Sequence, residues 1–249
     1  MNLTTEALVL SAQTVAEKDV LLFLLSPRWG RLTALAKGGR KSKRRFVNTL
    51  EPFSHLRVHL RGGKAGLPPF LDQADLLNPF EGLRVSPLSF VKASYFCELV
   101  ESFFGPSTGG EIFSPLLQAL TSLEQGDCPW GLLKLHFELR VLKASGFFPR
   151  LGECGRCGGL PRRLFFFSFR DGGLVCAACR QEEDFPLSPP TLSLMRHAAT
   201  LSPEKLKRLH PGPENLAQAG KIVENFLCYH LDREINSLRI LKEMLKNSD

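Results

Sequence analysis

Four of the seven cysteines in this 249-residue chain stand in two pairs with the spacing of metal ligands. Cys154 and Cys157 form the first pair, Cys176 and Cys179 the second, and 18 residues separate the pairs. Two residues between paired cysteines let one tight turn direct both sulfur atoms at a single ion, while backbone N–H groups approach the thiolates. A hairpin across the intervening residues would bring the two turns together and complete a tetrahedral shell of four sulfur ligands.

Such a shell selects Zn2+ or an iron–sulfur centre, and zinc is the commoner occupant. Four protein ligands leave no open position for a substrate, so we predict a structural zinc ion. The alternative, that the pairs form disulfides or carry out redox chemistry, is disfavoured because no secretory signal and no βαβ pattern accompany them. The other three cysteines, Cys97, Cys128 and Cys228, are expected to be buried small side chains or plain thiols.

A second group of residues suited to binding is the cationic run at 37–45, Lys-Gly-Gly-Arg-Lys-Ser-Lys-Arg-Arg. The chain has a net charge of +7, and its first 80 residues hold 12 lysines and arginines against 6 acidic residues. Such cations neutralise phosphates and release counterions, so the run predicts a nucleic-acid-binding surface; the alternative is a solvated loop. Trp29 is either a base-stacking residue or a partly buried turn side chain. The predicted contacts are Arg28, Arg31, Lys37, Arg40, Lys41, Lys43, Arg44, Arg45, Arg57 and Arg61.

No motif for catalysis accompanies these groups. The sequence has no GxxxxGK[ST] phosphate loop, no HExxH and no GxSxG, and its six histidines have no metal-ligand spacing. We therefore predict a protein without a catalytic centre, with a nucleic-acid enzyme of unrecognised site as the alternative. No signal peptide and no apolar run of ~18 residues is present, so we expect a cytoplasmic protein that does not contact the membrane.

The elements that must position these residues change in kind near residue 80. Five short apolar or alternating segments predict strands at 7–11, 20–26, 32–36, 53–61 and 70–77. Five strands suit an OB-fold barrel, which binds single strands by a positive groove. A period of 3.6 residues then predicts helices at 90–104, 111–123, 130–145, 191–200, 203–209, 214–230 and 235–246.

The predicted fold class is α+β, with an N-terminal OB-fold β-barrel, a helical bundle domain, and a four-cysteine zinc module inserted in the helical part. The barrel domain, assigned to DNA binding, takes residues 1–80 and the zinc-binding module residues 151–184. The helical domain takes residues 81–150 and 185–249. Within the module, segments 163–169 and 174–175 predict a hairpin, and 186–190 predicts an irregular linker.

The order of these motifs resembles, over essentially the whole chain, the bacterial recombination mediator family RecO of the RecFOR pathway. The resemblance is carried by Thr-Glu-Ala-Leu-Val-Leu at 5–10, Lys-Gly-Gly-Arg-Lys-Ser at 37–42, Leu-Lys-Ala-Ser-Gly-Phe-Phe-Pro at 142–149, the four paired cysteines, Phe-Leu-Cys-Tyr-His-Leu at 226–231 and Ser-Leu-Arg at 237–239.

This resemblance implies a role in the repair of DNA damage and in DNA recombination. It implies that the OB-fold binds single- and double-stranded DNA and anneals complementary strands without ATP. It also implies that the protein, with RecR, helps load RecA onto DNA coated by single-stranded-DNA-binding protein, whose acidic C-terminal tail it contacts. Some members of the family lack the cysteines, so zinc is implied to be a scaffold. The alternative function is a zinc-ribbon adaptor that binds RNA or takes part in transcription.

Overall fold

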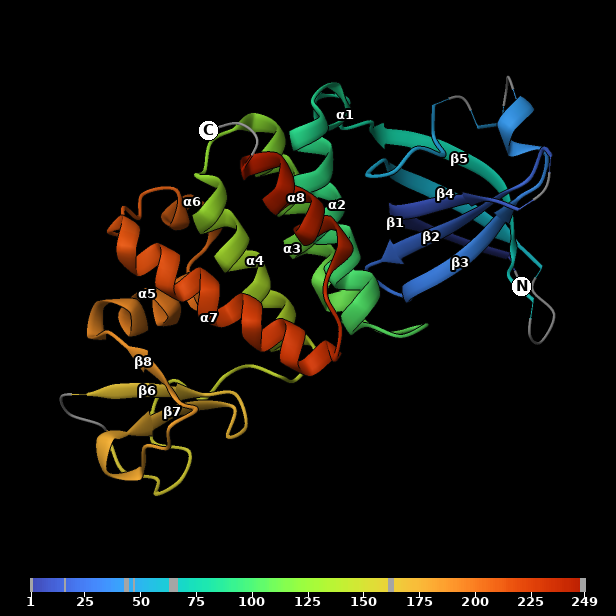
Figure 1. Cartoon of the computed structure of the whole chain (residues 1–249). Helices are drawn as coiled ribbons and strands as arrows, with labels where there is room; N and C mark the ends of the chain where they lie inside the picture. Colours follow the sequence, from blue (N-terminus) through green and yellow to red (C-terminus); the bar gives the residue numbers. More distant parts are fainter. Residues whose placement is uncertain are drawn as a thin grey trace. The chain divides into compact units, whose positions relative to one another are not determined.

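The computed structural model describes residues 2–15, 17–42, 45–46, 48–62, 67–160 and 164–246 of the chain (Figure 1). The chain divides into two compact units. The first comprises Met1–Gln125 together with Ile235–Asp249, and the second comprises Gly126–Glu234. The two ends of the chain, blue and red in Figure 1, therefore belong to the same unit.

The first unit contains a closed barrel of five strands in the order β1-β2-β3-β5-β4. The strands are β1 (Asn2–Thr14), β2 (Val20–Ser26), β3 (Gly30–Ala36), β4 (His55–Arg61) and β5 (Phe70–Asn78). Along β4, Leu56, Val58 and Leu60 are buried in the barrel core, whereas Arg57 and Arg61 are exposed. The predicted OB-type barrel is thereby confirmed, with alternate side chains of β4 presenting cations to solvent.

β1 is much longer than the predicted strand at 7–11, because it serves two neighbours. Its first half pairs with β4, from Asn2 opposite Arg61 to Leu8 opposite His55. From Leu8 to Thr14 it pairs with β2, and this pairing contains a bulge between Val9 and Ser11, where the strand bends. The hydrophobic pattern marks only the middle of β1, where both neighbours bury it.

Helices complete the first unit beside the barrel. They are α1 (Gly82–Val85), α2 (Pro87–Phe103), the 3₁₀ helix η2 (Gly110–Ile112), α3 (Phe113–Gln125) and the C-terminal α8 (Asn236–Lys246). α8 packs on α2 (Figure 1). The carboxylate of Glu98 on α2 accepts hydrogen bonds from the backbone N–H groups of Asn236 and Ser237, at 2.9 and 2.8 Å. This carboxylate satisfies the first amides of α8 and so joins the chain's last helix to the N-terminal half of the sequence.

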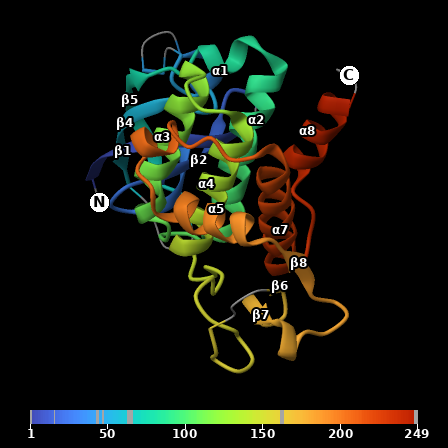
Figure 2. The same ribbon diagram turned by 90° about the vertical axis from the view of Figure 1, so that its left-hand side faces the viewer.

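The second unit is built from helices and a small sheet (Figure 2). Its helices are α4 (Trp130–Ala144), α5 (Pro189–Thr200), α6 (Pro203–Leu206) and α7 (Pro213–Leu231), and α4 packs against both α5 and α7. Its sheet has the order β7-β6-β8, made of β6 (Phe165–Ser168), β7 (Gly173–Cys176) and β8 (Phe185–Leu187). Among the described helices of the chain, none has the length and apolar character needed to cross a membrane.

The prediction of an irregular linker at 186–190 is wrong, because β8 and the start of α5 occupy these residues. Pro186 lies opposite Phe166 in the pairing of β8 with β6. A proline has no N–H to donate, but β8 is an edge strand and can accommodate it. The next prolines begin α5, where the hydroxyl of Ser188 accepts a hydrogen bond from the N–H of Thr191 at 3.2 Å. The prolines that predict a linker therefore mark an edge strand and a helix start.

Candidate metal centre and nucleic-acid interface

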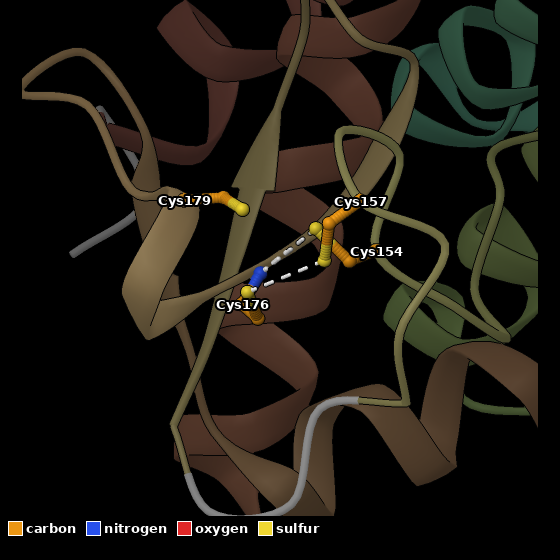
Figure 3. Close-up of side chains that lie close together, drawn as sticks. All are labelled: Cys154, Cys157, Cys176 and Cys179. Carbon is orange, nitrogen blue, oxygen red and sulfur yellow. Dashed lines mark hydrogen bonds between the residues drawn. The ribbon is translucent and has the colours of Figure 1, made fainter.

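The four paired cysteines converge on one point in the second unit (Figure 3). Their Sγ atoms all lie within 4.8 Å of one another. Cys154 and Cys157 lie in the loop before β6, Cys176 ends β7, and Cys179 ends the 3₁₀ helix η3 (Ala177–Cys179). Cys154 is buried and Cys157 is exposed. Four sulfur ligands at this spacing can bind one metal ion.

The first pair sits on a tight turn that the backbone holds closed. The N–H of Gly158 donates to the carbonyl of Cys154 at 2.8 Å, and the N–H of Cys154 donates to the carbonyl of Gly159 at 2.9 Å. The N–H of Gly155 donates to the carbonyl of Leu174 at 2.8 Å, which fastens the turn to β7. The two cysteine pairs are therefore brought together by the hairpin of β6 and β7.

The electrostatics of the cluster suit a cation. Burial raises the pKa of the Cys154 thiol, but backbone N–H groups, among them that of Cys176 at 3.4 Å from the sulfur, bring this pKa down to about 6. Hydrogen bonds to the sulfur atoms of Cys176 and Cys157 raise the pKa of the Cys179 thiol to about 12. The amides thus favour a thiolate at one ligand, and a bound divalent cation would favour thiolates at all four.

Arg156, which lies between the two cysteines of the first pair, connects the two turns. Its guanidinium donates to the carbonyl of Cys179 at 2.6 Å, to the carboxylate of Asp184 at 2.6 Å and to that of Asp171 at 2.9 Å. The Asp184 side chain is fully buried, and its carboxylate also accepts the N–H of Gln181 at 2.8 Å. Arg156 therefore holds the first turn on the second through charge-assisted hydrogen bonds. Sequence reasoning missed this residue; its only signal was an arginine within a Cys-x-x-Cys pair.

The phenylalanines that follow the first cysteine pair fix the module on the helices of its own unit. Phe167 on β6 packs edge-on against Phe226 on α7, with ring centroids 5.3 Å apart. Phe169 contacts Phe185 and Tyr229, at 4.8 and 6.2 Å between centroids. The phenylalanine-rich run therefore acts as packing surface between the small sheet and α7.

The basic loop, residues 37–42 and 45 of the described chain, is ordered by contacts with the turn between β1 and β2. It contains the 3₁₀ helix η1 (Gly39–Lys41). Gly38 has a φ of +66°, and its N–H donates to the carboxylate of Asp19 at 2.8 Å. The N–H of Arg40 donates to the carbonyl of Lys18 at 3.2 Å. These bonds hold the backbone, and the Arg40 and Lys41 side chains remain exposed.

Two more cations of the basic loop each lie near an aromatic ring. The Arg45 guanidinium donates to the carbonyl of Lys37 at 2.9 Å and lies 4.9 Å from the ring centroid of Phe46. The Lys37 ammonium lies 4.7 Å from the ring centroid of Phe70. The structure thus gathers Lys37, Arg40, Lys41 and Arg45 in one loop. The predicted contacts Lys43 and Arg44 lie outside the described residues.

The other predicted DNA contacts differ in whether their charged groups already interact with other groups of the protein. The Arg31 guanidinium donates to the backbone carbonyl of Glu101, at 2.7 Å, and to that of Phe104, at the end of α2. Arg61 forms an exposed ion pair with Asp72 at 3.4 Å. Their role in binding stays a prediction.

Trp29 is predicted as a stacking residue or a partly buried turn residue. The Arg28 guanidinium lies 5.3 Å from the Trp29 ring centroid, and the ring itself is half-buried. Arg57 is exposed on β4. The two alternatives for Trp29 stay open.

The closed barrel, the helices and the four-cysteine cluster define an α+β protein of the OB-barrel class with a potential metal-binding module between α4 and α5. Comparison with known families gives one match to the N-terminal part of the chain and a second match to the part that follows it. The model described as Recombination protein O N terminal matches residues 1–80, and the model described as Recombination protein O C terminal matches residues 84–239. The chain belongs to this family of DNA repair and recombination proteins.

Relatives match over nearly the whole chain. A DNA repair protein RecO from Myxococcus xanthus is 34% identical over 243 residues, which are 96% of each chain. One from Desulforudis audaxviator is 33% identical over 96% of each chain, and one from Syntrophus aciditrophicus is 30% identical over 96% of this chain and 95% of the relative. The matched length spans the barrel, the helices and the cysteine module.

Proposed function

We propose that this chain is a mediator of homologous recombination that binds single- and double-stranded DNA and anneals complementary strands without ATP. The observation that carries the proposal is the cluster of exposed cations on an OB-type barrel, in a chain that belongs to a DNA repair and recombination family. In its cellular role the chain, together with RecR, helps to load RecA onto DNA coated by single-stranded-DNA-binding protein.

Annealing requires electrostatics rather than a catalytic centre. Two complementary strands repel each other as polyanions, and a cationic surface that neutralises both raises their local concentration. The bases then recognise each other by pairing, so the protein needs no sequence readout. The chain is accordingly proposed to act without enzymatic chemistry of its own.

The basic loop is proposed as the principal DNA contact. Its backbone is fixed to the β1–β2 turn, so little backbone entropy is lost when the exposed cations bind DNA. Arg57 and Arg61 extend the positive surface along β4. Arg31, whose guanidinium is engaged by α2, is assigned a flanking role. The full proposed set is Arg28, Arg31, Lys37, Arg40, Lys41, Lys43, Arg44, Arg45, Arg57 and Arg61.

We assign the cysteine cluster to a structural Zn2+ ion bound by Cys154, Cys157, Cys176 and Cys179. Four thiolates match the borderline-soft character of zinc and close its coordination shell. The bound ion would fix the two turns and the hairpin between them. In this assignment the zinc supplies folding energy to the module and no chemistry to DNA binding.

The partners proposed besides DNA and RecR are single-stranded-DNA-binding protein, through its acidic C-terminal tail, and the RecA filament that is loaded. Family membership supports this proposal. We likewise propose that the protein is cytoplasmic and associated with the bacterial nucleoid.

The test is annealing of complementary fluorescent oligonucleotides without nucleotide cofactor, over a series of salt concentrations. The double variant Lys41→Glu with Arg45→Glu should fail to anneal them, and the slope of log binding constant against log salt should fall by about one for each phosphate that the variant no longer neutralises. The control is Lys205→Glu with Arg208→Glu, an equal change of charge on exposed residues of the second unit. Normal annealing by the first variant would refute the proposed interface, and preferential binding of RNA in competition would favour an RNA adaptor.

A further inference from the structure

A cavity of about 590 Å3 lies beside the basic loop, where β1 ends and β2 begins. It is lined by the end of β1 at Thr14, by the start of β2 at Val20, and by described residues of the stretch after β3, which are Gly39, Arg40, Ser42, Phe46, Asn48, Thr49, Leu50, Glu51 and Pro52. Its volume falls within the ~300–1,000 Å3 range of small-molecule sites. All of the residues that line it belong to the first unit. Neither DNA annealing nor metal binding, as derived above, uses this cavity.

Two buried apolar side chains and one buried hydroxyl group line the cavity. Val20 and Phe46 line it and are 7% and 4% exposed. Thr49 also lines it and is 3% exposed, and its Oγ1 is buried without a hydrogen-bond partner among the described residues. Buried polar groups are almost always hydrogen-bonded, so the Thr49 hydroxyl has the capacity to pair with a polar group that enters the cavity.

The exposed lining of the cavity carries one cation, one carboxylate and two polar groups. Arg40, Glu51, Thr14 and Asn48 line it and are exposed. Arg40 follows Gly39, which packs closely against the barrel. A Cβ atom at Gly39 would lie 2.7 Å from the Cδ1 atom of Leu50 and 3.2 Å from the Cβ atom of Ala36, so the small size of glycine suits this close approach of η1.

We propose that this cavity receives the base of one unpaired nucleotide from the DNA strand that the basic loop binds. The buried apolar side chains suit the faces of a heterocyclic base, and the Thr49 hydroxyl pairs with its polar edge. Arg40 neutralises the phosphate of the same nucleotide. The ligand class is thus a base attached to a sugar phosphate, and the inference rests on the proposed function of the loop. A base within a duplex cannot enter, so the cavity gives single strands an additional contact that double strands lack.

The experiment compares two oligonucleotides of equal length and charge, oligo-dT and an abasic oligomer, by fluorescence anisotropy with the full chain. The wild-type protein should bind oligo-dT more tightly than the abasic oligomer. Thr49→Val keeps the shape of the side chain and removes the hydroxyl. Because one hydrogen bond is removed, this variant should bind oligo-dT about two- to tenfold more weakly than the wild type does. The affinity of the variant for the abasic oligomer should equal that of the wild type.

Two further variants provide a second test of the cavity and a matched control. Thr14→Trp places a large side chain in the exposed lining of the cavity, at a strand end, and should likewise remove the preference for oligo-dT. Thr33→Val on β3, away from the cavity, is the matched control and should behave as the wild type. Circular dichroism of each variant establishes that it is folded.

The outcomes distinguish a failure of the cavity proposal from a failure of the proposed function of the basic loop. If Thr49→Val and Thr14→Trp bind both oligomers as the wild type does, the cavity proposal is overturned while the basic loop is untouched. If the Lys41→Glu, Arg45→Glu variant binds both oligomers normally, the proposed function of the loop fails instead. Competition with free dTMP distinguishes a free mononucleotide from a nucleotide within a DNA strand. If dTMP displaces oligo-dT only when it is in large excess, the cavity binds a base within a strand. If dTMP binds more tightly than oligo-dT, the proposal is overturned.

Discussion

Arg156 shows how much of the cysteine module depends on a residue that is not a ligand. Its guanidinium contacts the buried Asp184 carboxylate and the carbonyl of Cys179, so it joins both turns. We expect Arg156→Met to weaken binding of the proposed zinc ion about 10–100-fold, because the turns lose their common support and Asp184 loses its cationic partner. Competition against a chromophoric chelator measures the affinity.

The matched control for this prediction is Arg170→Met, which removes an exposed arginine from the same module. It should leave the zinc affinity within the experimental error of the wild type. Equal affinities for the Arg156 and Arg170 variants would show that the ligands alone hold the ion.

His136 provides a pH-dependent contribution to stability in the second unit. The imidazole is 8% exposed and its Nδ1 lies 2.7 Å from the carbonyl of Ala198. Burial, the largest effect, lowers the pKa of His136 below its ordinary value; the bond to Ala198 opposes this and the charge of Arg140 adds to it. Between the folded and unfolded pKa values the unfolded chain binds more protons, so the free energy of unfolding falls as the pH drops through this interval.

His136→Gln keeps a donor for the carbonyl of Ala198 and removes the titration. The urea midpoint of the wild type should therefore fall more than that of the variant between pH 8 and pH 5. Parallel decreases in both proteins would show that His136 does not contribute to the pH dependence.

At the scale of elements, the attachment of α8 depends on one carboxylate. Glu98 accepts the N–H groups of Asn236 and Ser237 and also the Ser237 hydroxyl at 2.5 Å. Glu98→Ala should destabilise the docked helix by about 0.5–2 kcal/mol, the range found for loss of a helix cap. Amide hydrogen exchange should become faster in α8, while Glu81→Ala, an exposed change in the same unit, should leave it unaltered. Unchanged protection of α8 would contradict the role of Glu98.

Several elements were predictable because the local pattern and the final packing agree. The alternation of β4 marks a strand with one buried face, and the residue Gly146 after α4 has the φ of +83° that a helix stop requires. The four cysteines were predictable for the same reason, since their spacing alone dictates the two turns.

Other features were not predictable because they depend on residues distant in sequence. β8 becomes a strand only because β6 offers it an edge, which no signal in Phe185–Leu187 discloses. Arg156 finds Asp184 28 positions away, and Thr49 lines the cavity with Thr14, 35 positions earlier in the chain. The pairing of Glu98 with Asn236 spans 138 residues. The periodicity of the sequence does not predict such long-range partners.

At the scale of the whole molecule, the barrel and the cysteine module have separate cores. The barrel core includes Ala7, Leu22 and Val58, each fully buried, whereas Cys154, Phe166 and Val175 form the small core of the module. The barrel core is built entirely from side chains of the first unit. A loss of order in the module therefore leaves the packing of the barrel core intact.

This separation predicts what removal of the metal does. A strong chelator should increase proteolysis and hydrogen exchange within residues 151–184, because the two cysteine turns then lose the ion that joins them and the small core of the module cannot hold the hairpin alone. Exchange in β2 and the affinity for oligo-dT should remain those of the metal-loaded protein. Cys157→Ser with Cys176→Ser should reproduce the effect without a chelator. A parallel loss of DNA affinity in the chelated protein and in this variant would mean that the ion supports the DNA interface itself, and would refute its role as a scaffold for the second unit alone.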